Sequence, residues 1–124
     1  MATWNDVKAY VRQNYKTEDL GDGLKIVFEE EGGRSQLVFL YQVGAWVAVA
    51  SPISPIEKVD ANRALVSSAM GTAPGGLAIF GGLVVYVCAL YIDSIQGPEL
   101  LEAIELITSA ADGIENELGL GDDW

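Results

Sequence analysis

The chain has 124 residues, 7 of them basic and 18 acidic, which gives a formal net charge of −11. Such an acidic surface repels phosphate groups, so the composition argues against nucleic acid and anionic lipid membranes as partners. Half of the residues are hydrophobic, which excludes disorder as the default state, and the length suits one domain with its own core.

The charges are unevenly distributed along the chain. All seven basic residues lie within the first 63 positions, and nine acids but no base follow from Ala64 onward. This pattern favours solubility, with steering of a basic partner as the alternative. Cys88 is the one cysteine, so no internal disulfide can form, and we expect a buried, inert thiol. No signal-peptide pattern opens the sequence, and we therefore predict a cytoplasmic protein.

The first predicted element is a helix over residues 3–15. Thr3 and Asp6 have the spacing of a capping box, with Asp in place of Glu, and apolar residues then recur at helical spacing. Residues 16–23 include two glycines and are predicted to end this helix before the first strand begins.

Three strands are predicted next, over residues 24–29, 34–41 and 45–50. Short glycine-containing turns separate them, so they form an antiparallel meander. Pro52 has no N–H to donate to a strand ladder, and we expect it to mark the exit from the third strand.

Both faces of this meander are apolar. If helices cover one face, the other is left for a partner. One set of side chains is Leu37, Phe39, Tyr41, Trp46, Ala48 and Ala50, and the opposite set is Val38, Leu40, Val47 and Val49.

A second helix is predicted from about residue 56 or 60 to residue 70. It is rich in small residues, and the glycines and proline of residues 71–76 end it. Residues 77–92 then form a hairpin of two strands joined at Gly81-Gly82, within a stretch of the chain that carries no charge. The return strand is apolar on both faces, which is typical of a strand inside a sheet.

The last predicted element is a helix over residues 98–118. Its apolar stripe is Leu100, Ile104, Ile107, Ala111, Ile114 and Leu118, and acids, including Glu115, are expected on the rest of its circumference. The order helix, three strands, helix, two strands, helix predicts a single α+β domain over residues 1–118, with a mostly antiparallel five-stranded sheet. Residues 119–124 are a short acidic tail.

Two segments carry a family resemblance. The hairpin GGLAIFGGLVVYVCALYI, followed by an acidic amphipathic helix, and the opening helix WNDVKAYVRQNY resemble the YbjN-like branch of the type III secretion chaperone-like fold. Members of that fold are generally small, acidic and non-enzymatic, and they commonly form homodimers through the second helix and neighbouring strands. The secretion chaperones among them hold partner segments in extended form. The resemblance implies a dimer contact at residues 61–70 and 77–80.

The residues show no catalytic machinery. There is no histidine, residues 71–76 lack the lysine of a phosphate-binding loop, and the acidic runs at residues 29–31 and 122–123 lack EF-hand spacing. We therefore predict no cofactor and no metal. The alternatives are an enzyme that uses carboxylates alone or with a metal, and a membrane-associated protein through residues 77–92.

The sequence thus predicts a non-enzymatic protein-interaction module that forms a homodimer and binds a protein client whose identity the residues do not reveal. No nucleic acid or membrane partner is expected. The residues assigned to the interface are Val38, Leu40, Val47, Val49, Ala61, Ala64, Leu65, Ser68, Ala69, Leu77, Ile79, Val85 and Val87.

Overall fold

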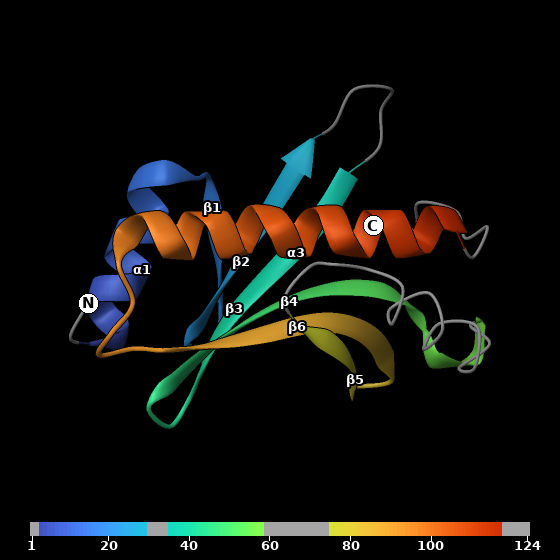
Figure 1. Ribbon diagram of the computed structural model, residues 1–124, viewed down its shortest axis with the longest axis horizontal. Helices are drawn as coiled ribbons and strands as arrows, with labels where there is room; N and C mark the ends of the chain where they lie inside the picture. Colours follow the sequence, from blue (N-terminus) through green and yellow to red (C-terminus); the bar gives the residue numbers. More distant parts are fainter. Residues whose placement is uncertain (1–2, 30–34, 59–74, 118–124) are drawn as a thin grey trace.

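The computed structural model describes residues 3–29, 35–58 and 75–117, and it has the predicted α+β class (Figure 1). A 3₁₀ turn, Ile56–Lys58, follows the fourth strand. The helices and strands of the described part, in chain order, are α1 (Trp4–Asn14), β1 (Thr17–Leu20), β2 (Gly23–Glu29), β3 (Ser35–Val43), β4 (Trp46–Pro55), β5 (Gly76–Phe80), β6 (Leu83–Tyr91) and α3 (Gly97–Glu117).

The strands form one antiparallel sheet in the order β1-β2-β3-β4-β6-β5. Helix α3 runs across one face of this sheet and contacts β3, β4 and β6, and α1 packs beside the start of α3 (Figure 1). Tyr10 of α1 lies so close to Gly97 that a Cβ at that position would be 2.5 Å from the Tyr10 ring. The two helices and the sheet therefore share one core.

Helix α1 begins where the sequence predicts. The hydroxyl of Thr3 accepts a hydrogen bond from the backbone N–H of Asp6 at 3.1 Å, and the Asp6 carboxylate accepts one from the Thr3 N–H at 3.2 Å. This reciprocal pair is the capping box. Trp4 is buried in the core, and its indole N–H donates to the backbone carbonyl of Asp22, which ties the helix to the β1–β2 turn.

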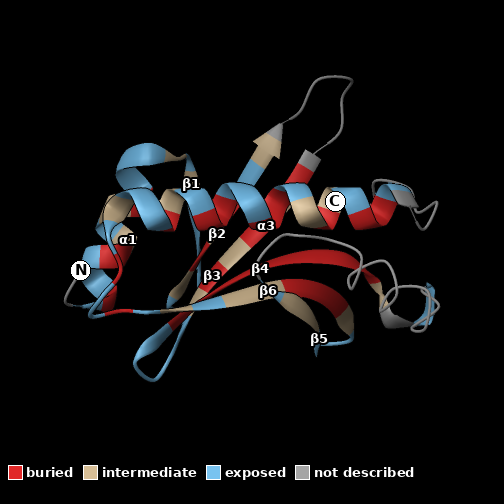
Figure 2. Ribbon diagram, in the orientation of Figure 1, coloured by how far each residue is buried: buried red, intermediate tan, exposed pale blue. Residues whose placement is uncertain are grey.

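The apolar stripe of α3 faces the sheet, with Leu100, Ile104, Ile107, Ala111 and Ile114 all buried (Figure 2). The sixth predicted member, Leu118, lies outside the described residues.

Glu115 contradicts the prediction for the polar side of α3, because it is 0% exposed. It follows Ala111 by four positions and therefore lies on the buried stripe. Its carboxylate accepts a hydrogen bond from the amide N–H of Gln36, which is also buried, at 3.4 Å. The same amide donates to the hydroxyl of Ser51 at 2.6 Å. A polar cluster thus lies between α3 and strands β3 and β4.

The sheet has six described strands instead of the predicted five, because residues 17–20 form β1. Three of these four residues are polar and the strand is largely exposed, so it lacks the alternation of buried apolar and exposed polar side chains that predicts a strand. Main-chain pairing with β2 and two ion pairs hold β1 in place: Glu18 with Lys25 at 2.9 Å, and Arg12 with Asp19 at 3.0 Å.

Strand β4 also continues further than predicted, through Pro52 to Pro55. It pairs with β3 only as far as Ala50, whereas it pairs with β6 from Trp46 to Pro55. On the β3 side, the end of β4 is therefore an edge, where a residue without an N–H is tolerated. A register shift between Pro52 and Ser54 bends the strand at this point.

The predicted hairpin is confirmed as β5 and β6, and β6 is an interior strand between β4 and β5. The predicted second helix falls mostly within residues 59–74, which are outside the described residues, as is the tail at residues 119–124.

Candidate interaction surface

The sheet has two faces that differ in what covers them. Residues paired across an antiparallel ladder project to the same face, so the register assigns every strand position. Leu24, Leu40 and Val49 are linked in this way, and they project toward α3 and are fully buried. We call the other side the open face. In the described part it consists of Leu20, Lys25, Val27, Leu37, Phe39, Tyr41, Val43, Trp46, Ala48, Ala50, Pro52, Ala78, Phe80, Leu83, Val85, Val87, Ala89 and Tyr91, with Glu18 at its margin.

Exposed apolar side chains gather on the open face. Eight large hydrophobic residues are exposed in the described part, and six of them are on this face: Leu20, Val27, Val43, Trp46, Phe80 and Tyr91. The other two are Ile79, on the edge strand β5, and Leu106, on α3. Single exposed hydrophobic residues are normal on a protein surface, whereas a group on one face indicates an interaction site.

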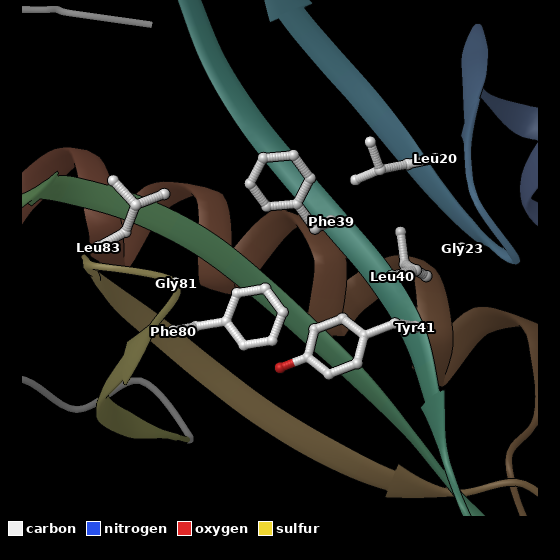
Figure 3. A pocket seen from close by; sticks show the side chains of 8 residues that line it. All are labelled: Leu20, Gly23, Phe39, Leu40, Tyr41, Phe80, Gly81 and Leu83. Atoms are coloured by element: carbon white, nitrogen blue, oxygen red, sulfur yellow. The ribbon is translucent and has the colours of Figure 1, made fainter.

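The open face is curled. The rings of Tyr41 in β3 and Phe80 in β5 stack with their centroids 5.3 Å apart, although β4 and β6 lie between those two strands in the sheet. Figure 3 shows the two side chains pointing toward each other in front of β4, with α3 behind the sheet. The bend in β4 and the small side chains of Ala48 and Ala50 leave room for this curl, and both alanines are buried.

The curl creates a shallow groove of about 410 Å³ on the open face (Figure 3). Its apolar side chains come from three parts of the sheet: Leu20 at the end of β1, Phe39 and Tyr41 in β3, and Phe80 and Leu83 at the tip of the hairpin. The Tyr41 hydroxyl is the polar group among these side chains, and burial raises its pKa, which keeps it neutral at physiological pH. The groove can therefore accept apolar groups, and the neutral Tyr41 hydroxyl is the side-chain group there that can donate or accept a hydrogen bond.

A second aromatic pair lies where β4 begins and β6 ends. Trp46 and Tyr91 are paired across the ladder, and their rings meet edge to face at 5.3 Å. Both side chains are about half exposed, at 48% and 42%. Tryptophan and tyrosine are enriched at protein interfaces, because they offer a large apolar area at a low cost in conformational entropy.

The structure corrects part of the predicted interface. Val38, Leu40, Val47 and Val49 lie in the core beneath α3, where they are 1% exposed or less, so they offer no surface to a partner. The meander has two apolar faces as predicted, but α3 covers the aliphatic one and leaves the aromatic one open. The amphipathic side chains of Tyr41 and Trp46 could have indicated this assignment, since aromatic residues with a polar group favour surfaces that are partly wet.

The other predicted interface residues have different positions. Val85 and Val87 are on the open face, the first buried and the second half-buried. On β5, Leu77 packs against the core, whereas Ile79 is 66% exposed. Ala61, Ala64, Leu65, Ser68 and Ala69 lie outside the described residues.

A metal site, a membrane span or a reactive thiol would each need particular features in the described ranges. Residues 3–29, 35–58 and 75–117 contain no cluster of three or more histidine, cysteine, aspartate or glutamate side chains that could hold a metal. None of the helices described is long and apolar enough to cross a membrane. Cys88 is half-buried in β6, and burial raises the pKa of its thiol, which disfavours the reactive thiolate.

Comparison of the chain with models of protein families finds no match, and comparison with curated proteins finds no similar sequence.

Proposed function

We propose that the chain is a non-enzymatic protein-interaction module that acts as a homodimer and makes its contacts through the open face of the sheet. The observation that carries this proposal is the grouping of six of the eight exposed large hydrophobic residues of the described part on that face. Burial of such a surface is the dominant favourable term in most protein associations.

The resemblance to the secretion chaperone-like fold is consistent with this proposal. The α+β class agrees with what the resemblance implies, and dimerisation and the binding of a protein client are what that resemblance adds. The residues implied for a dimer contact at 61–70 are outside the described part, so the open face is the surface on which the proposal is based.

The enzyme alternative would need at least two carboxylates converging in a pocket. Among the described residues Glu115 is the buried carboxylate, and it lies between α3 and the sheet instead of in the groove. The membrane alternative would need an inserted segment at residues 77–92, and that segment folds as the strands β5 and β6 of the sheet.

The proposal is tested by measuring the mass in solution together with the binding of a hydrophobic dye. At high micromolar concentration, light scattering should give twice the 13.2 kDa of the chain. Dilution should dissociate the dimer and raise the fluorescence of 8-anilinonaphthalene-1-sulfonate as apolar surface becomes free. A monomer at high micromolar concentration that also binds no dye would contradict the proposal.

A further inference from the structure

The area of the open face is adequate for a specific contact. Its six exposed large hydrophobic residues are each roughly half exposed. At about 150–250 Å² for a fully exposed aromatic side chain, and less for an aliphatic one, they present on the order of 500 Å² of apolar surface. A standard interface buries about 800 Å² on each partner, so the half-buried neighbours Phe39, Tyr41 and Val87 and a polar margin would complete it.

The distribution of charge favours a second copy as the occupant. Strands β3, β4, β5 and β6 contain no charged residue, and at the margin of the open face Glu18 is already paired with Lys25 at 2.9 Å. The exposed acids Glu99, Glu102 and Glu105 are on α3, on the opposite side of the sheet. Two chains of charge −11 repel each other, and contact through their open faces keeps both acidic helices on the outside.

The open face combines a groove with exposed apolar side chains. An isologous contact about a two-fold axis needs projections and recesses on the same surface. Leu20 and Phe80 line the groove together with Phe39, Tyr41 and Leu83, and each of the two side chains is more than half exposed, at 53% and 55% (Figure 3). Each copy can therefore present an apolar projection to the groove of the other.

We infer that the partner at the open face is a second copy of the same chain, placed open face to open face about a two-fold axis. This inference rests on the proposed function and specifies which surfaces meet. The contact includes the groove and the Trp46–Tyr91 pair, whereas α3 and the free edge of β5 lie outside it.

The test is sedimentation equilibrium of charge variants in about 0.15 M salt, where repulsion between distant charges is screened. Val43→Glu and Leu20→Glu each place a carboxylate on the open face, at side chains that are more than half exposed in the single chain, so both should fold. Leu106→Glu on α3 and Ile79→Glu on β5 add the same charge elsewhere and are the matched controls. Circular dichroism and urea unfolding verify that each variant is folded.

Both open-face variants should raise the dissociation constant of the dimer by about 100-fold or more, because each buries two unpaired carboxylates in the contact. The two controls should change it by less than about threefold. Raising the salt concentration should tighten the wild-type dimer, because it screens the repulsion between the two acidic copies.

Two results would overturn the inference, and of the proposed function they would leave only the protein-interaction module, without its homodimer contact through the open face. The first is a wild-type dimer that Ile79→Glu or Leu106→Glu disrupts while the open-face variants do not, which would place the contact at the β5 edge or at α3. The second is a wild-type monomer that binds the dye, which would indicate a different protein as the partner. A monomer without dye binding would remove both proposals.

Discussion

The assignment of the two sheet faces can be tested with one type of substitution, Leu→Ala, made once on each face. Leu40 is 1% exposed beneath α3, whereas Leu20 is 53% exposed on the open face. At Leu40 the substitution removes about three methylene-sized groups from the core and leaves a cavity, so it should cost about 2–5 kcal/mol of unfolding free energy. At Leu20 the side chain is only half removed from water, so about half of its free energy of burial is lost and no cavity forms. The cost there should be about 1 kcal/mol of unfolding free energy.

The assay is urea unfolding, followed by circular dichroism at a concentration low enough for the chain to be monomeric. With a slope of about 1–3 kcal/mol per molar urea, the difference between the two variants corresponds to roughly 1 M or more in the midpoint. At high concentration, the cost of Leu20→Ala should increase, because the variant also weakens the dimer, whereas the cost of Leu40→Ala should increase much less. An equal or larger cost for Leu20→Ala in the dilute sample would show that the faces are assigned wrongly.

Three further predictions concern local features of the fold. Thr3→Ala should cost about 1 kcal/mol by removing the hydroxyl that caps α1, and Thr3→Ser should restore most of it; equal urea midpoints for the two variants would contradict the role of the cap. Gly23→Ala should cost about 1–3 kcal/mol, since its Cβ would lie 2.6 Å from a main-chain carbonyl oxygen of β3, whereas Gly76→Ala, with open space around the Cβ, should be nearly neutral in the same assay. Burial raises the pKa of Cys88 above its usual 9.0 and that of Tyr41 above its usual 10.0, so the unfolded chain releases these protons first. Stability should therefore fall as the pH rises from about 9 through the folded pKa values, and urea midpoints that stay constant over that range would refute this.

The elements with a clear local signal could be predicted from the sequence. The capping box of α1 and the apolar stripes of α1 and α3 depend on residues that are three or four positions apart in the chain. Such residues are also neighbours on the helix, so the pattern is visible in the sequence. The paired glycines at 81–82 place the turn of the β5–β6 hairpin for the same reason, since both have positive φ angles of 56° and 78°.

The elements that depend on distant contacts could not be predicted in this way. Strand β1 has no apolar alternation and exists because β2 offers it a free edge. Proline is tolerated within β4 because β3 no longer pairs there, which only the register reveals. Glu115 is buried against the sheet, where it accepts a hydrogen bond from Gln36, 79 positions earlier in the chain. In each case a partner far away in the chain decides the outcome.

The sequence shows that both faces of the meander are apolar, and it does not show which one receives α3. That choice depends on fit: the aliphatic side chains of Leu40 and Val49 pack beneath the helix stripe, and the rings of Tyr41 and Trp46 are left on the other side.

The emission of Trp46 tests most directly whether the open face is the contact surface. In a Trp4→Phe, Trp124→Phe background, Trp46 is the one remaining tryptophan, and it is 48% exposed in the single chain. As the protein concentration rises from nanomolar to high micromolar, its emission should shift to shorter wavelength and become less accessible to iodide, in parallel with the doubling of mass. A mass that doubles while the emission and quenching of Trp46 stay constant would contradict the assignment of the contact to this face.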